Sequence, residues 1–126
     1  MKKGLTLLEI MIVVVILAIL AGASYPIYMR SVARARESEG WLFLTSIRSS
    51  EFRFYTEHDD QFTGTLPDLD LDATQTPLFT YCIWGTLPDH FIGVAVPRRP
   101  QCAGCHPLCL DEDGVRGEEG DCPGCS

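Results

Sequence analysis

The chain has 126 residues, a formal net charge of −7 at pH 7 and six cysteines. This length accommodates one small domain together with an anchor. The acidic balance argues against nucleic acid as a partner, because phosphate binding needs concentrated Lys and Arg. The sequence also has no glycine-rich phosphate loop and no recognisable catalytic constellation, so we expect a protein that is not an enzyme.

The segment from Leu5 to Ala23 contains a single charged side chain, Glu9. As an α-helix it spans roughly 29 Å, which is close to the hydrocarbon thickness of a bilayer. A carboxylate within such a segment costs on the order of 2.5–3.5 kcal/mol. A helix that served as a simple anchor has no use for this group, so we expect Glu9 to find a cationic partner.

Cleavage of a short leader, residues 1–4, would create that partner. A cut after Gly4 leaves Leu5 with a free α-amino group, which is largely protonated at neutral pH. A cation at a helix N-terminus opposes the helix dipole, whereas an anion in the first turn suits it. An amine from one subunit that meets Glu9 of another compensates both charges and sets the axial offset between neighbouring helices.

The residues Gly4-Leu5-Thr6-Leu7-Leu8-Glu9 and the apolar run after them resemble the prepilin signature of type IV pilins and type II secretion pseudopilins. In that family a prepilin peptidase cuts after the glycine and N-methylates the next residue, and the glutamate guides assembly. The resemblance implies processing at Gly4 and Leu5 and an assembly role for Glu9. Leu5 departs from the Phe that is usual at this position.

The resemblance also implies a location and a set of partners. The subunit is expected in the inner membrane, surrounded by lipid before assembly, as a single pass with its C-terminal domain periplasmic or extracellular. It then forms a homopolymer, a pilus or a pseudopilus, with the help of an inner-membrane assembly platform and a motor ATPase.

Two plainer interpretations of the N-terminal segment remain. An ordinary signal peptide would use Lys2 and Lys3, the apolar run and a cleavage site at residues 21–23, and it would release a secreted Cys-rich domain. A simple single-span anchor is the other. Neither interpretation gives Glu9 a purpose, since it stands where both need an apolar residue.

Periodicity and punctuation predict an α+β chain in which one long helix precedes a small antiparallel β-sheet. Pro26 is expected to kink the helix without ending it. The strands are expected at 78–84 and 91–96, joined by a loop at 85–89, with a weaker pair at 107–110 and 115–116. The resulting organisation is a leader (1–4), a transmembrane and polymerisation helix (5–28), its amphipathic continuation (29–56) and an exported β domain with a Cys-rich C-terminal tail (57–126). This layout is the pilin-like fold that the resemblance implies.

Five of the six cysteines fall in the last 25 residues, where apolar residues are scarce. In an exported domain this concentration indicates disulfides, each contributing about 2–4 kcal/mol. Six cysteines allow 15 connectivities, and the sequence does not choose between them. The cysteines are Cys82, Cys102, Cys105, Cys109, Cys122 and Cys125.

Two cofactor hypotheses compete with disulfides. Cys102, Cys105 and His106 match the C-x-x-C-H pattern of haem c attachment, which makes a membrane-anchored or filamentous c-type haem protein the alternative function. Cys102 and Cys105 with Cys122 and Cys125 fit the spacing of a zinc ribbon. We expect no cofactor, because export favours oxidation of the thiols.

Calcium is a third candidate ligand. Asp111, Asp113, Glu118 and Asp121 collect oxygen ligands in one loop. Major pseudopilins hold calcium in a C-terminal loop, so the resemblance supports such a site here. The segment 111–114 is equally typical of a turn between two short strands, and it lacks the EF-hand spacing.

Overall fold

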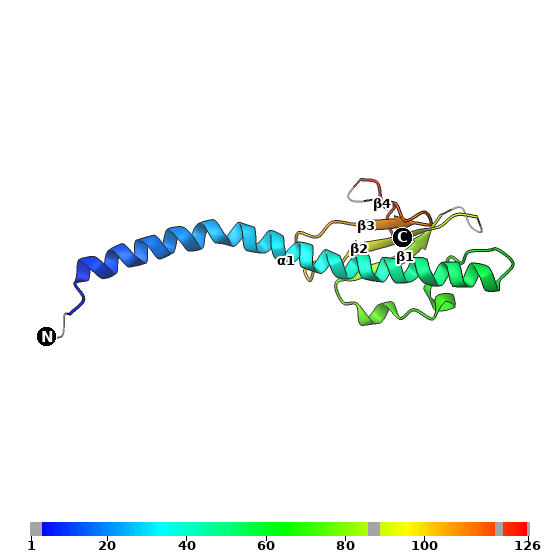
Figure 1. Cartoon of the computed structure of the whole chain (residues 1–126), viewed down its shortest axis with the longest axis horizontal. Helices are drawn as coiled ribbons and strands as arrows, with labels where there is room; N and C mark the ends of the chain where they lie inside the picture. The colour runs from blue at the N-terminus through cyan, green and yellow to red at the C-terminus, as the bar shows by residue number, and fades with distance from the viewer. Residues whose placement is uncertain (1–3, 86–88, 118–119, 126) are drawn as a thin grey trace. The chain divides into compact units, whose positions relative to one another are not determined.

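The computed structural model describes residues 4–85, 89–117 and 120–125. The chain forms two compact units, Met1–Val32 and Ala33–Ser126. Helix α1 (Leu7–Glu57) belongs to both, and it continues through Pro26 (Figure 1). The long N-terminal helix predicted from the apolar run and its continuation is therefore confirmed.

The second unit contains a four-stranded antiparallel sheet in the order β1-β2-β3-β4. The strands are β1 (Phe79–Trp84), β2 (Ile92–Pro97), β3 (Leu108–Asp111) and β4 (Arg116–Gly117). Two short 3₁₀ helices, η1 (Leu66–Leu69) and η2 (Ala73–Gln75), lie between α1 and β1. All four strands occur where the sequence predicts them. Residues 86–88 of the predicted loop at 85–89 lie outside the described residues.

The C-terminal part of α1 packs against one face of this sheet, and two glycines permit the close approach. A Cβ atom at Gly40 would lie 2.9 Å from Cδ1 of Leu108 and 3.3 Å from the Phe79 ring. A Cβ atom at Gly93 would lie 3.3 Å from Cδ2 of Leu44. The buried cluster between the two layers comprises Leu44, Ile47, Leu69, Phe79, Tyr81, Ala95, Cys102, Cys105, Leu108 and Leu110.

Disulfides hold the end of the chain against the opposite face of the sheet. The strand register places Cys82, Val94 and Cys109 side by side, and they alternate with the residues that face α1. Cys82 is bonded to Cys125 and Cys109 to Cys122, so residues 122–125 join β1 to β3 across β2. Val94 is 0% exposed beneath this connection. The alternation of side chains along the strands therefore places Cys82 and Cys109 where they can form disulfides with Cys125 and Cys122, a pairing that the sequence leaves open.

Candidate processing and assembly site

Gly4 and Leu5 precede the first residue of α1 and have no regular secondary structure. A Cβ atom built on Gly4 meets nothing within 4 Å, and the Leu5 side chain is 71% exposed. The peptide bond between them is therefore open to an enzyme. No contact within the described residues requires glycine at position 4, since a side chain there would have free space. Residues 1–3 of the predicted leader lie outside the described residues.

Thr6 caps the N-terminus of α1. Its hydroxyl accepts a hydrogen bond from the backbone N–H of Glu9 at 3.3 Å, and its carbonyl accepts from the N–H of Ile10, also at 3.3 Å. A threonine followed three residues later by a glutamate, just before an apolar run, is the sequence signature of a capping box. That signal was available in the sequence, and it gives Thr6 a structural role beyond matching a motif.

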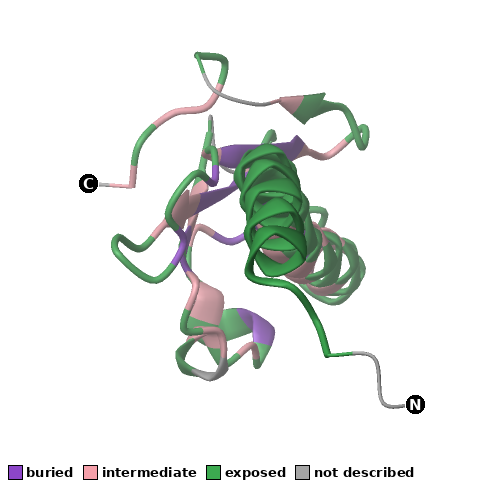
Figure 2. Cartoon of the chain, turned by 90° about the vertical axis from the view of Figure 1, so that its left-hand side faces the viewer, coloured by how far each residue is buried: buried purple, intermediate pink, exposed green. Residues whose placement is uncertain are grey.

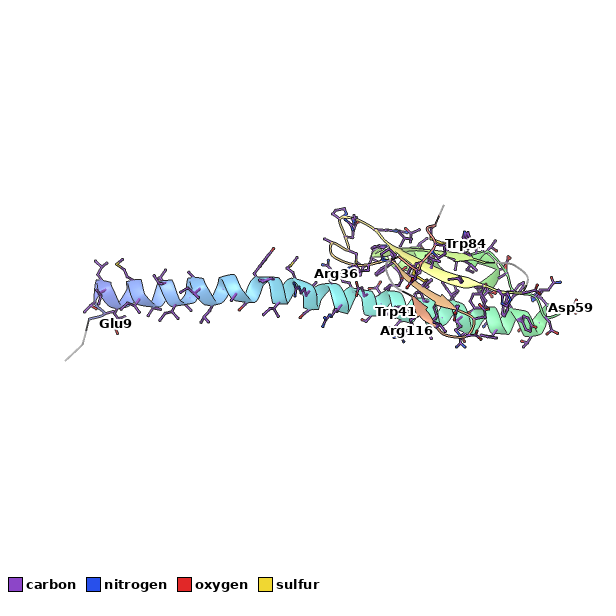
Figure 3. All side chains as sticks on the ribbon, turned by 90° about the horizontal axis from the view of Figure 1, so that it is seen from above. Glu9, Arg36, Trp41, Asp59, Trp84 and Arg116 are labelled. Carbon is purple, nitrogen blue, oxygen red and sulfur yellow. A yellow bond between two sulfur atoms is a disulfide. The ribbon has the colours of Figure 1, made fainter. Side chains whose placement is uncertain are left out.

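Glu9 lies in the first turn of α1, where the helix dipole favours a negative charge (Figure 3). Its side chain is exposed. Within the described part of the chain, no Lys, Arg or His lies within ion-pair distance of it. The compensating cation that the sequence calls for is not supplied by these residues.

The helix around Glu9 exposes apolar side chains on all sides. Every large apolar residue from Leu7 to Leu20 is exposed, and no residue of α1 before Ala33 is buried (Figure 2). The same helix is long and apolar enough to cross a membrane, and its most apolar window is entirely unburied. The core helix of a soluble protein is mostly buried, whereas no described residue of this chain buries the apolar surface of residues 7–20.

The C-x-x-C-H motif follows β2 and lies against the second unit's helix. Cys102 and Cys105 are buried and bonded to each other. The backbone N–H of His106 donates to Oε1 of Glu37 at 3.0 Å, and its Nδ1 lies 3.1 Å from the same oxygen. A sulfur in a disulfide can neither bond a haem vinyl group nor ligate zinc, so both cofactor hypotheses require the reduced chain.

The segment 111–114 forms a tight turn between β3 and β4. Asp111 accepts hydrogen bonds from Val115 N–H at its Oδ1 and from Gly114 N–H at its carbonyl. The guanidinium of Arg48 donates to the carbonyl of Glu112 at 2.9 Å. Among the described residues no three His, Cys, Asp or Glu side chains gather as metal ligands, and Glu118 is outside that set. The calcium site stays a prediction.

A buried carboxylate in the second unit escaped the sequence analysis. Glu51 is 0% exposed on the core side of α1, and its Oε2 accepts a hydrogen bond from Thr63 N–H at 3.0 Å. Its Oε1 has no hydrogen-bond partner within the described chain. Burial raises the pKa of Glu51 to about 7; the Thr63 hydrogen bond opposes this, and the Asp68 carboxylate adds to it. The available signal was its spacing from Leu44 and Ile47, which puts it on the apolar stripe.

Comparison with known proteins identifies the N-terminal segment. Residues 1–25 match the model of the prokaryotic N-terminal methylation motif. The chain is 38% identical over 60 residues to a fimbrial protein of Neisseria meningitidis serogroup B, covering 48% of this chain and 35% of that protein. It is 40% identical over 58 residues to the type IV major pilin PilE1 of Neisseria gonorrhoeae, covering 46% of this chain and 35% of that protein.

A third relative shows the same pattern: the type IV major pilin PilA of Myxococcus xanthus is 37% identical over 58 residues, covering 46% of this chain and 26% of PilA. The matched stretch therefore spans about a third of the length of these relatives or less. The crystal structure of the non-core minor pilin PilV of Neisseria meningitidis superimposes with a TM-score of 0.55 at 21% identity, covering 75% of this chain and 93% of PilV. This likeness shows the fold.

Together these findings show that the chain carries the N-terminal methylation motif, is similar to type IV pilins over about half of its length and has a pilin-like fold. The resemblance drawn from Gly4 to Glu9 is confirmed, as is the pilin-like α+β fold.

Proposed function

We propose that the chain is a structural subunit of a type IV pilus, cut between Gly4 and Leu5, methylated at Leu5 and polymerised through α1. One observation carries the proposal: an exposed apolar helix with a single carboxylate in its capped first turn. Such a helix is stable where other apolar surfaces cover it and where a cation meets the carboxylate. A filament of identical subunits supplies both.

In each contact between neighbouring subunits, one subunit supplies the amine of Leu5 and the other supplies the carboxylate of Glu9. Cleavage before Leu5 exposes an amine four residues before Glu9 and two residues before the first residue of α1. In a bundle with a small axial offset, the amine of one subunit reaches Glu9 of the next. The pair then lies in an apolar environment, where an uncompensated charge is costly and a wrong offset is disfavoured. The offset between helices is therefore set by electrostatics and the cohesion by apolar burial.

The proposal assigns the location and partners as follows. The precursor spans the inner membrane with its leader on the cytoplasmic side and its second unit on the periplasmic side, and a prepilin peptidase removes the leader. An assembly platform and a motor ATPase then move subunits from lipid into a homopolymer with a non-enzymatic role. The matched relatives are pilins by name, which favours a pilus over the pseudopilus of a type II secretion system.

Substitution of Glu9 tests the assembly step. Because its side chain is exposed, Glu9→Val leaves the chain's own packing intact. We expect this variant to be processed but to yield no sheared filaments on immunoblots, whereas Glu9→Asp, which keeps the charge, retains a measurable yield. Normal filaments from Glu9→Val would contradict the proposal.

Substitution of Gly4 tests the processing step. A bulky side chain has free space at this position, so Gly4→Phe should fold normally and fail only as a peptidase substrate. The matched control is Gly4→Ala, which we expect to be cut. Mass spectrometry of the N-terminal peptide shows whether each variant has been cut. A wild-type protein that begins near Ser24 would show a signal peptide instead, and haem absorbance in the purified protein would support the cytochrome alternative.

A further inference from the structure

The second unit carries a cluster of arginines where α1 enters it. Arg36 Nη1 donates to the carbonyl of Gln101 at 2.9 Å. This hydrogen bond holds the first turns of α1 within the second unit against the loop after β2. This contact brings four cationic side chains to one end of the unit, which we call the basic end. They are Arg34, Arg36, Arg98 and Arg99. Three of these four, all except Arg36, are exposed.

The carboxylates near the basic end are partly engaged. Glu37 is held by the backbone N–H and ring of His106. Glu39 lies two residues further along α1 and is half-buried. The exposed charge at this end is therefore mainly positive, although the chain as a whole is acidic.

Carboxylates gather where α1 leaves the sheet. The Phe62 ring packs against Tyr55 and Phe91, with ring centroids 4.6 and 4.8 Å apart, and this brings the end of the β1–β2 hairpin beside the end of α1. We call this the acidic end. Its exposed carboxylates are Glu57, Asp59, Asp60 and Asp89.

Other titratable groups at this end leave its sign unchanged. Asp68 and Asp70 line a hollow of about 400 Å³ together with Glu57, Arg53 and His58. His90 lies in the same hairpin, and its Nδ1 is 2.6 Å from Oε1 of Glu112. The carboxylates therefore outnumber the single arginine, Arg53, and the net charge of the acidic end remains negative.

The two ends are far apart in the unit. Arg36 and Glu57 are separated by 21 helical residues, which corresponds to roughly 32 Å. Figure 3 shows Arg36 and Asp59 toward opposite ends of the unit. A charge distribution of this kind is complementary to itself when copies are arranged head to tail.

We propose that the acidic end of one subunit docks on the basic end of another copy of this chain, as a second contact in addition to the helix bundle. A head-to-tail contact of this kind is heterologous, and in the proposed filament it repeats from one copy to the next without closing into a ring. This inference rests on the proposed filament function. It also gives the arginines after the apolar helix a purpose, since basic residues on the exported flank oppose the usual charge bias of membrane proteins.

A second copy fits these observations better than a membrane surface. Anionic lipid would attract the basic end and leave the acidic end without a counterpart. In a second copy, the acidic end of one chain attracts the basic end of the other, so both ends have a counterpart. An arrangement that brings like charges together costs several kcal/mol.

Two complementary variants test the contact in the full chain. Arg34→Glu with Arg99→Glu leaves two arginines and two glutamates at the basic end, and Glu57→Arg with Asp89→Arg leaves two aspartates and two arginines at the acidic end. Each variant therefore cancels the net charge of one end. Asp59 and Asp60 are left unchanged because each has a positive φ, 49° and 57°, that disfavours a long side chain. Each double variant expressed alone should lower the yield of sheared filaments about tenfold or more, since one end has then lost the net charge that attracts the other.

Co-expression of the two double variants should restore filaments in which they alternate, with a yield within about threefold of wild type. Arg34→Lys with Arg99→Lys, which keeps the charge, should assemble as wild type does. Unfolding temperature and N-terminal mass, measured for every variant, show that folding and processing are intact. If the filament yield rises on mixing, each variant must be folded and able to assemble, because a misfolded subunit could not restore the yield.

Three results would overturn the inference. If wild type assembles but mixing restores nothing, the docking contact is wrong and the filament function stands. If basic-end reversal alone impairs assembly and also weakens binding to phosphatidylglycerol vesicles, that end serves a membrane surface. If wild-type protein forms no filaments at all, the proposed function fails and the docking contact fails with it.

Discussion

The two halves of α1 have opposite relationships with the rest of the chain. From Leu7 to Val32 no residue is buried, whereas from Ala33 onward Gly40, Leu44 and Ile47 face the sheet. Burial of a Leu, Ile or Val side chain contributes roughly 1.5–3 kcal/mol. The second half obtains this within its own unit. Under the proposed function, the first half obtains it from lipid before assembly and from other subunits in the filament.

The largest expected effect concerns two disulfides, both of which lie within the second unit. Cys82→Ser with Cys125→Ser opens a link between residues 43 apart, against 13 for Cys109 and Cys122. Loop-closure entropy then predicts a loss of about 4 kcal/mol for the first pair and about 3 kcal/mol for the second. Chemical denaturation of the detergent-solubilised full chain measures both losses. Processing at Gly4 should continue in both variants; a block there would show that the units depend on each other.

The next effect is a pH dependence that belongs to the second unit alone. The raised pKa of Glu51 means that the folded state binds more protons than the unfolded state between about pH 4.5 and 7. Stability from this group is therefore greatest at acid pH and falls as the pH rises toward 7, by on the order of 3 kcal/mol. Glu51→Gln should remove that slope from the unfolding free energy, because it cannot ionise. An unchanged slope would mean that other groups produce it.

A pair of glycines compares the halves of α1 directly. A Cβ atom at Gly40 would come within 2.9 Å of Leu108, whereas one at Gly22 meets nothing within 4 Å. Gly40→Val should lower the unfolding free energy by about 2 kcal/mol through overpacking. Gly22→Val should leave it unchanged and act, if at all, on filament yield. Equal losses from the two variants would show that the first unit has packing of its own.

The smallest expected effect concerns the start of α1. Thr6→Ala removes the hydroxyl that accepts from Glu9 N–H, which should cost about 1 kcal/mol of local helix stability. Amide exchange of residues 7–9 in micelles should accelerate about fivefold, while Thr6→Ser, which keeps the hydroxyl, should not change it. Global unfolding of the second unit should be unaffected. Unchanged exchange in Thr6→Ala would mean that the cap contributes nothing.

The sequence predicted features that depend on residues close together along the chain. The motif from Gly4 to Glu9 predicted a processing and assembly site, because a carboxylate in an apolar segment demands an explanation before any fold is known. Composition and periodicity also gave the long helix and the positions of the four strands. The burial of Glu51 is harder to predict, because a carboxylate is ordinarily exposed and only its spacing from Leu44 and Ile47 indicates the buried face of α1.

The tertiary structure decided what depends on distant residues meeting. The cysteine pairing follows from the strand register, which sets Cys82 and Cys109 on one face two strands apart, within reach of Cys122 and Cys125. The opposite charges at the two ends of the second unit likewise arise only when loops remote in sequence pack beside α1. The sequence by itself predicted the long apolar helix and the methylation motif at its start, since both lie in one continuous segment of the chain. Connectivity and surface charge required the fold, because a linear pattern does not record which strands become neighbours.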